Sequence, residues 1–233
     1  MTVGSAPLRL GEAEIELVPL SDADPLLASP QFLSAWLAEE ERRTLLGLAT
    51  TKRKRDWLAA RLAAKRLIGK RLKSMGQEVS PNEIQVLATP DREPYIGLMG
   101  KSAAADFPIS ISHAGDWGAC ALAAKGTRVG FDLERIEPRH PGWVSVMADE
   151  TELDAGMKAS PEMLTSLWTA KEAVLKLLGL GLSVDMRSVR PRSDGTVELL
   201  GRSLERWAKL GRPRITLFHG RHSDCGMTAA IGR

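Results

Sequence analysis

Two pairs of similar segments constrain the fold of this chain more than any other feature of its sequence. WLAARLAAKRLIG, which begins at Trp57, resembles WTAKEAVLKLLG, which begins at Trp168. ISHAGDWGACALAA, from Ile111, resembles LFHGRHSDCGMTAAIG, from Leu217. The first pair has the spacing of amphipathic helices, and the second pair is typical of strands around a turn. Composition alone could produce such similarity, but a true repeat would make each half a helix packed on a small antiparallel sheet.

We therefore predict an α+β fold with two similar halves, residues 1–125 and 126–233. A ligand site between two such halves would agree with the usual preference of ligands for domain interfaces.

The helices expected from the pattern lie in three regions. Residues 30–73 predict two helices, of which the second is long and amphipathic, with Leu58 facing inward. Residues 161–179 predict a helix that begins with a proline and stops at a glycine. Residues 149–158 also have a helical pattern, whereas the tail from residue 196 suggests strands around a turn.

The bulk properties indicate a soluble globular protein. The 233 residues could form one ordinary domain or two small ones, with 43% hydrophobic and 26% charged residues. No apolar run approaches the roughly 20 residues that span a bilayer, and no secretory signal is evident at the N-terminus. Cys120 and Cys225 are far apart and are expected to be buried thiols in a reducing compartment. We expect a cytoplasmic protein with no membrane partner.

Basic charge is concentrated in residues 52–73. This block holds ten Lys or Arg and one acid, Asp56, for a local charge of +9, against −6 for the rest of the chain. Such a block indicates a polyanionic partner, which could be nucleic acid, a phosphate-rich small molecule or an acidic protein. A solvated helix face without a partner explains the same pattern.

The stretch GFDLERI, residues 130–136, places two carboxylates on one face of a predicted strand. Strand alternation directs Phe131 and Leu133 into a core and leaves Asp132 and Glu134 together on the other face. If that face meets solvent, water and salt screen the repulsion between the two acids. Alternatively a cation lies between them, and oxygen ligands on a rigid element suit Mg²⁺.

The helix at 161–179 carries a second candidate set. Trp168, Glu172 and Lys176 lie at i, i+4 and i+8, so they share one helical stripe. An ordinary Glu–Lys pair explains the spacing without any function. Beside the strand carboxylates, however, Glu172 could complete a metal site or act as a base, and Lys176 could neutralise phosphate charge. Phosphoryl transfer requires this combination.

SISHAG, residues 110–115, is the third candidate motif. A histidine at a strand end beside Ser112 and a glycine can donate to a phosphate oxygen, with close approach of the backbone. Without a ligand, His113 would be a turn histidine that caps local carbonyls.

Together, SISHAGDWGACALA, VGFDLERI and LWTAKEAVLKLLGLGL resemble the 4′-phosphopantetheinyl transferases, in particular the longer, monomeric, surfactin-type members. The resemblance runs from about Leu37 to Gly226. It implies two halves related by a pseudo-twofold axis, with the active site between them. It also implies an enzyme that moves 4′-phosphopantetheine from coenzyme A to a serine of an acyl or peptidyl carrier protein, releasing 3′,5′-ADP.

The resemblance also implies roles for individual residues. Asp132 and Glu134 would bind Mg²⁺, with Glu172 as third ligand, as base for the carrier serine, or as both. Lys176 would stabilise the transferring phosphate. The residues implied in contact with coenzyme A are Ser112, His113 and Lys176, with Arg61 and either Arg55 or Arg42 from the N-terminal half.

The chain departs from the family pattern before the histidine strand. Many members have G-K-P there, with the lysine on the 3′-phosphate of coenzyme A, whereas this chain has DREPY with Glu93 in that position. We expect Arg92 or the basic helix to replace the lysine.

Two other functions explain part of the pattern. A magnesium-dependent nuclease could use the same carboxylates and hold DNA on the basic block, although that block has few aromatics among its cations, and we expect no nucleic-acid partner. A non-catalytic module that binds acidic carrier proteins would need no metal carboxylates.

Overall fold

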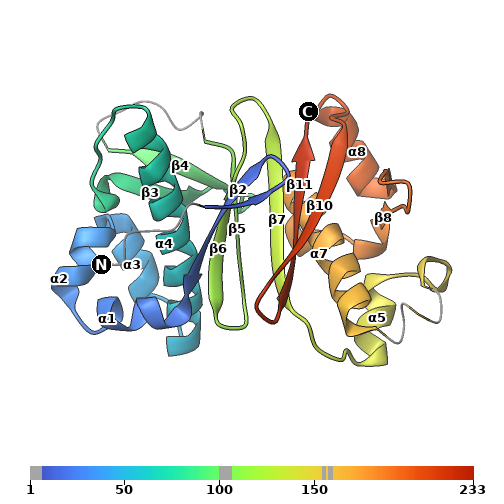
Figure 1. Cartoon of the computed structure of the whole chain (residues 1–233), viewed down its shortest axis with the longest axis horizontal. Helices are drawn as coiled ribbons and strands as arrows, with labels where there is room; N and C mark the ends of the chain where they lie inside the picture. The colour runs from blue at the N-terminus through green and yellow to red at the C-terminus, as the bar shows by residue number, and fades with distance from the viewer. Residues whose placement is uncertain (1–6, 100–106, 154–155, 157–159) are drawn as a thin grey trace.

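The structure, a computed structural model, describes residues 7–99, 107–153, 156 and 160–233. Two antiparallel sheets lie side by side at the centre, and helices flank them on both sides (Figure 1). The strands of the N-terminal part are β1 (Leu8–Leu10), β2 (Ala13–Pro19), β3 (Ile84–Ala88), β4 (Pro94–Leu98), β5 (Ile109–Ala114) and β6 (Trp117–Leu122). Those of the C-terminal part are β7 (Arg128–Arg135), β8 (Val189–Pro191), β9 (Val197–Leu199), β10 (Ile215–His222) and β11 (Cys225–Gly232). The helices are α1 (Asp24–Leu27), α2 (Pro30–Trp36), α3 (Glu39–Leu46), α4 (Thr51–Ser74), α5 (Pro141–Met147), α7 (Pro161–Leu177) and α8 (Gly201–Lys209).

The two central sheets have the orders β1-β2-β6-β5 and β10-β11-β7, and every pairing in them is antiparallel. The hairpins β3–β4 and β8–β9 form separate two-stranded sheets. The prediction of a mixed helix and antiparallel-sheet fold is confirmed. The division of the chain between residues 125 and 126 stays a prediction.

Serine side chains join the two sheets where β5 meets β7. The backbone N–H of Phe131 donates to Ser110 Oγ at 2.9 Å, and Ser112 Oγ donates to Asp132 Oδ1 at 2.8 Å. Because Ser110 and Ser112 are two residues apart, both side chains leave β5 on the same face. A buried backbone donor of β7 is thereby satisfied without a strand ladder between the sheets.

Each central sheet is covered by one long helix, which approaches it closely at a glycine. A Cβ at Gly118 of β6 would lie 2.3 Å from the backbone nitrogen of Ala60 in α4. A Cβ at Gly130 of β7 would lie 1.8 Å from the carbonyl oxygen of Ala173 in α7. Both contacts are shorter than any van der Waals separation, so the absence of a side chain fixes how near each helix lies. The predicted packing of a helix on a small antiparallel sheet is thus seen at both central sheets.

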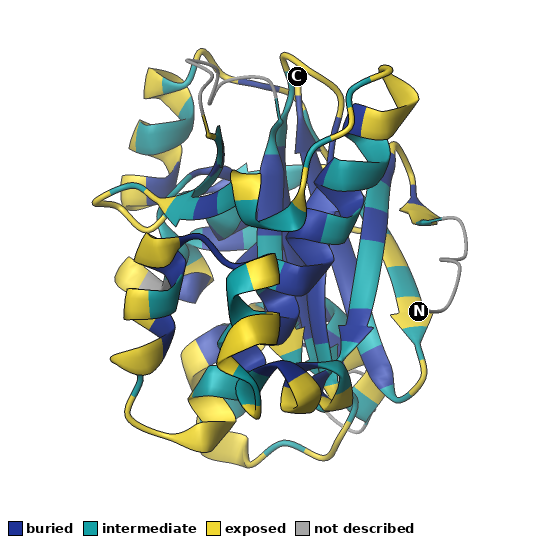
Figure 2. Cartoon of the chain, turned by 90° about the vertical axis from the view of Figure 1, so that its left-hand side faces the viewer, coloured by how far each residue is buried: buried dark blue, intermediate teal, exposed yellow. Residues whose placement is uncertain are grey.

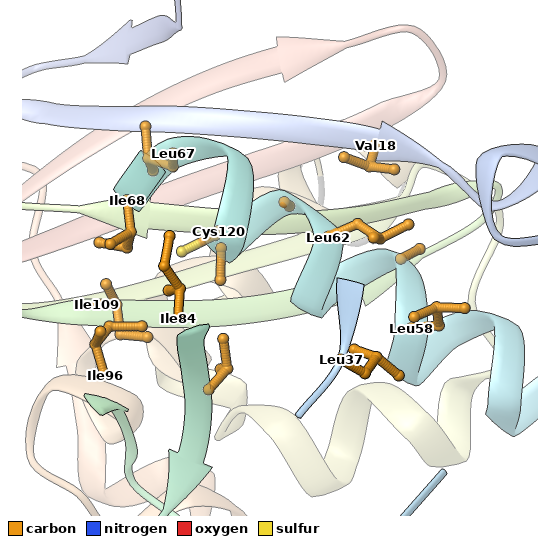
Figure 3. Packing of buried hydrophobic residues seen from close by; sticks show 14 of the residues in the cluster. Val18, Leu37, Leu58, Leu62, Leu67, Ile68, Ile84, Ile96, Ile109 and Cys120 are labelled. Carbon is orange, nitrogen blue, oxygen red and sulfur yellow. The ribbon is translucent and has the colours of Figure 1, made fainter. Parts of the chain in front are cut away.

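Alternation along the strands and the helical period direct the apolar residues inward as predicted. Leu58 and Leu62 of α4 are fully buried in a cluster with residues of β3, β4, β5 and β6 (Figure 3). Phe131 and Leu133 of β7 are buried in a second cluster, with residues of β1, β2, β6 and β11. Figure 2 shows the buried interior, with exposed residues on the outer faces of the helices.

Three predicted elements differ from the observed ones. Residues 30–73 form three helices instead of two, because the chain is extended at Leu37 and again at Thr50, whose side chain caps α4. The tail contains the helix α8, which we expected to be strand and turn. In the expected helix at 149–158, the described residues form a 3₁₀ turn at Glu150–Glu152 and are helical at residue 156, and residues 154–155 and 157–159 lie outside the described part.

Cys120 and Cys225 are free and buried, as expected. Burial raises the pKa of both thiols, that of Cys225 to about 12. Of the helices in the described part of the chain, none has both the length and the apolar character that a membrane crossing requires.

Candidate active site

Lys176 connects helix α7 to the junction of the two sheets. Its Nζ donates to Asp132 Oδ1 at 2.7 Å, to Ser112 Oγ at 3.1 Å and to the carbonyl oxygen of Phe131 at 3.0 Å. Residues from three separate motifs therefore meet at one ammonium group. The structure thus places Ser112, Asp132 and Lys176 in direct contact, as the sequence motifs suggested.

Asp132 is buried, with 4% of its surface exposed. The explanation of a solvent-screened strand face is therefore wrong for this residue, because α7 covers that face of β7. Its Oδ1 accepts hydrogen bonds from Lys176 and Ser112, whereas its Oδ2 is buried without a partner among the described residues. A buried carboxylate oxygen without a partner is costly, and a bound cation would satisfy it.

Glu172 lies one helical turn before Lys176 and is also buried. Burial raises its pKa to about 7, with Lys176 acting in the opposite direction and the nearby carboxylates of Asp132 and Glu134 adding to the rise. A carboxyl group with this pKa is divided between its acid and base forms near neutral pH. It can therefore accept a proton during a reaction.

Glu134 is held by a residue that the sequence analysis did not single out. Its Oε2 accepts from Arg139 Nη2 at 3.2 Å, and the Arg139 guanidinium lies 4.7 Å from the centre of the Trp143 ring. Trp143 in turn stacks on Trp168 of α7 at 4.4 Å between ring centres. Burial, followed by the charge of Asp132, raises the pKa of Glu134, and Arg139 lowers it.

The donor set of the three carboxylates fits a hard divalent cation, although the described residues form no group of three or more His, Cys, Asp or Glu that could hold a metal as placed. In this arrangement Asp132 accepts a hydrogen bond from Lys176, and Glu134 accepts one from Arg139. Oxygen ligands alone nevertheless suit Mg²⁺, and the buried Asp132 Oδ2 has no other partner among the described residues. Burial is the main cause of the raised pKa of Glu172, and the charges of Asp132 and Glu134 add to it, so a positive ion among the three carboxylates would favour their ionised forms.

His113, at the end of β5, faces helix α4. Its Nε2 lies 3.9 Å from Asp56 Oδ2, and Asp56 is held by Lys52 at 2.8 Å. Burial is the main cause of a lowered His113 pKa, and the charges of Lys176 and Lys52 add to it. The imidazole is therefore neutral at pH 7 and can donate one N–H. The signal for Asp56 in the sequence was its position as the single acid of the basic block.

The basic residues expected from the N-terminal half lie in different surroundings. The Arg61 guanidinium stacks 3.5 Å from the centre of the Trp57 ring, and burial lowers its pKa to about 10. Arg55 pairs with Asp24 at 2.8 Å. Arg42 is half-buried on α3.

Much of the charge of the basic block is neutralised within the fold. Lys65, one helical turn after Arg61, is fully buried and pairs with Glu41 at 2.7 Å. Six of the ten cations face carboxylates of the same chain, namely Lys52, Arg55, Lys65, Arg66, Lys70 and Arg71. The charge left for a polyanionic partner is therefore smaller than the sequence indicates.

A cleft of about 1000 Å³ lies beside the junction of the sheets. Lys176 and Ser110 line it, together with Arg92 from the turn before β4. The remaining basic residues of its lining were not singled out from the sequence, and these are Arg128, Arg202, Arg206 and Lys209. Three of them belong to α8, which the sequence pattern assigned to strand and turn.

Comparison with known proteins gives one family. The model of the 4′-phosphopantetheinyl transferase superfamily matches residues 128–217. A 4′-phosphopantetheinyl transferase of Bacillus subtilis is 32% identical over 113 residues, which cover 46% of this chain and 47% of that protein. The chain thus spans about half the length of this relative. A holo-[acyl-carrier-protein] synthase of Geobacillus sp. is 32% identical over 105 residues, which cover 44% of this chain and 86% of that protein.

Among solved structures, a holo-(acyl-carrier-protein) synthase of Bacillus anthracis in complex with CoA (3′,5′-ADP) aligns with a TM-score of 0.40 and 23% identity. That alignment covers 50% of this chain and 96% of the other.

Proposed function

The chain belongs to the 4′-phosphopantetheinyl transferase superfamily, and we propose that it transfers 4′-phosphopantetheine from coenzyme A to a serine of an apo acyl or peptidyl carrier protein. The observation that carries this proposal is the meeting of Asp132, Glu172 and Lys176 beside a cleft of about 1000 Å³. A cleft of this size can enclose a ligand as large as a nucleotide coenzyme.

Glu172 and Lys176 have separate roles in the proposed reaction. The carrier serine oxygen attacks the phosphorus that bears pantetheine, a new O–P bond forms, and the P–O bond to the adenosine-side phosphate breaks to release 3′,5′-ADP. Glu172 takes the serine proton, because its pKa of about 7 lets the ionised form accept it. Lys176 supplies positive charge to the transferring phosphate, since its ammonium lies at the edge of the cleft.

Residues of β5 would hold the pyrophosphate in place. The neutral imidazole of His113 offers one hydrogen-bond donor at the end of the strand, whereas the Ser112 hydroxyl, which donates to Asp132, would have to turn from that carboxylate to reach a phosphate. Holding the phosphates in line with the attacking serine is the main task of such a site, because phosphoryl transfer needs little covalent assistance. From the N-terminal half, Arg61 and either Arg55 or Arg42 would also contact coenzyme A.

Asp132, Glu134 and Glu172 would hold the Mg²⁺ ion. When bound, the ion would withdraw charge from the pyrophosphate and stabilise the leaving 3′,5′-ADP. The unpartnered Asp132 Oδ2 supports this assignment.

We also propose that the enzyme is a cytoplasmic monomer whose site lies between residues 1–125 and 126–233. Ser112 and His113 come from the first part, and the three carboxylates with Lys176 come from the second. One chain therefore contains all of the proposed groups, so that the reaction needs no second copy.

Intact mass spectrometry of an apo carrier protein tests the proposal. The carrier is incubated with this protein, coenzyme A and Mg²⁺, and its mass should rise by one phosphopantetheine, with no rise in EDTA. No gain on a panel of acyl and peptidyl carriers, from a protein that also fails to bind coenzyme A, would contradict the proposal. DNA cleavage under the same conditions would then support the nuclease.

A further inference from the structure

Arg139 lies in the loop between β7 and α5, outside the lining of the cleft, and reaches back to Glu134. Its Nη2 donates to Glu134 Oε2 at 3.2 Å and to the carbonyl oxygen of Arg135 at 2.9 Å, and its Nη1 donates to Glu137 Oε1 at 3.2 Å. Both terminal nitrogens of the guanidinium are therefore engaged, and Glu134 is held through one of its two oxygens.

The Arg139 side chain is fixed in this position by burial and by aromatic rings. Only 14% of it is exposed. Its guanidinium faces the Trp143 ring, which stacks on Trp168 of α7. Its Nε is buried without a hydrogen-bond partner among the described residues. A buried N–H without a partner costs free energy, so an arginine kept here at that cost calls for an explanation beyond packing.

Asp132 is also restricted to one free oxygen. Its Oδ1 accepts hydrogen bonds from Lys176 and Ser112, which leaves Oδ2 without a partner in the described part of the chain. Arg139 likewise takes Oε2 of Glu134 and leaves Oε1 for another partner. Two of the three carboxylates proposed to bind the metal thus offer a cation one oxygen each.

The number of oxygens that a carboxylate offers separates Mg²⁺ from Ca²⁺. Mg²⁺ prefers a regular octahedral shell and keeps several waters, so single carboxylate oxygens suit it. Ca²⁺ takes about six to eight oxygens at longer distances and also binds both oxygens of one carboxylate. A guanidinium fixed on the second oxygen therefore acts against Ca²⁺ more than against Mg²⁺.

We propose that Arg139 determines which divalent cation the site takes, because it leaves Glu134 one oxygen and so favours Mg²⁺ over Ca²⁺. This inference rests on the proposed function, since it concerns the ion of the same site. Arg139 is a positioning residue that acts through Glu134. Lys176 and Ser112 restrict Asp132 in the same way, but both also have proposed roles toward phosphate, so Arg139 is the residue at which ion selectivity is tested by itself.

Calorimetric titration of Arg139→Met with MgCl₂ and with CaCl₂, in the absence of coenzyme A and carrier protein, tests the proposal. Methionine keeps a thioether against the Trp143 ring and releases the second oxygen of Glu134. We expect the ratio of Ca²⁺ affinity to Mg²⁺ affinity to rise about tenfold over that of the wild-type protein. Arg135→Met is the matched control, because it removes the same charge from a neighbouring side chain that pairs with Asp224, and it should leave the ratio unchanged.

Glu134→Gln supplies a second test, which does not depend on whether Arg139→Met folds. An amide has only one oxygen to give, so this variant should bind both ions more weakly and keep the wild-type ratio. Arg139→Met added to Glu134→Gln should then no longer raise the ratio.

Four results would overturn the proposal. They are an unchanged ratio in folded Arg139→Met, an equal rise in the double variant, a ratio in Glu134→Gln that departs from wild type, and a wild-type protein that binds Ca²⁺ as tightly as Mg²⁺.

The carrier-protein mass assay separates this inference from the proposed function. If the wild-type protein transfers no phosphopantetheine but the ratio rises in Arg139→Met, the ion selectivity stands and the transferase proposal fails. If it transfers phosphopantetheine and the ratio does not change in Arg139→Met, the transferase proposal stands and this inference fails.

Discussion

At the scale of single residues, Glu172 gives the sharpest dependence of stability on pH. Its pKa is raised by burial to about 7 from an ordinary value of 4.5. Ionisation in the folded state is therefore unfavourable, and this cost is absent below pH 4.5, grows as the pH rises and is complete above pH 7. We predict that Glu172→Gln raises the free energy of unfolding at pH 8 by up to about 3 kcal/mol, and leaves it unchanged at pH 4.

Urea denaturation in EDTA, at both pH values, measures this difference without a bound cation. Equal stabilities of the variant and the wild-type protein at pH 8 would contradict the burial of an ionisable Glu172. A gain of the same size at pH 4 would show that the effect has nothing to do with charge.

Lys176 compensates the buried charge of Asp132. Removing the ammonium with Lys176→Met leaves that carboxylate without its 2.7 Å partner, and we predict a loss of about 3 kcal/mol in the free energy of unfolding. Asp132→Asn in the same chain should recover most of the loss, because the charge that needed a partner is gone. A double-mutant cycle by urea denaturation gives the coupling directly, and additive losses would contradict the pairing.

At the scale of elements, glycine substitutions on a strand and a helix should have opposite signs. Gly130→Ala would place a methyl group 1.8 Å from the Ala173 carbonyl oxygen, so we predict a loss of about 3 kcal/mol or more as α7 is pushed off the sheet. Gly69→Ala on α4 meets only Ile84 Cδ1 at 3.8 Å, and should stabilise the protein by about 0.5–1 kcal/mol.

Urea denaturation curves of Gly130→Ala and Gly69→Ala measure these changes in the free energy of unfolding. A Gly130→Ala protein as stable as the wild type would mean that α7 does not lie against β7 as closely as described, and Asp132 would then not be buried beneath it.

Elements with a strong period were predictable from the sequence, and those held by distant partners were not. The alternation in β7 placed Phe131 inside and Asp132 on the other face, because each strand position has only two possible directions. Lys65 shares the inward face of α4 with Leu58 and Leu62, and the sequence does not show that Glu41 of another helix neutralises its buried charge. The segment that forms α8 has no proline or strong cap to mark its start, and no local signal shows that Arg206 reaches the end of α7.

At the scale of the whole molecule, the candidate site arises where two sheets meet. Sequence motifs predicted its members one by one, since Ser112, Asp132, Glu172 and Lys176 each belong to a recognisable segment. Their proximity depends on the seam between β5 and β7, which serine side chains close. Arg139, which holds Glu134, lies in a loop without a periodic pattern, so its role could be found only from the fold.

Magnesium should stabilise the whole molecule through these carboxylates. We predict that millimolar MgCl₂ raises the Tm of the wild-type protein, because a ligand that binds only the folded state adds its binding free energy to stability. The rise should be much smaller for Asp132→Asn, which keeps the fold but loses the charge of a proposed ligand. Differential scanning calorimetry measures Tm with and without MgCl₂. An equal rise of Tm in both proteins would indicate that the ion binds elsewhere.

The most direct test of the account compares wild-type protein, Asp132→Asn and Glu172→Gln in one assay of carrier-protein mass, with coenzyme A and Mg²⁺ present. Circular dichroism first confirms that all three proteins are folded. We predict that the wild-type protein adds one phosphopantetheine to the carrier serine and that both variants add none in the same time. Wild-type rates in the folded variants would contradict the account, since the proposed proton acceptor and metal carboxylate would then be dispensable.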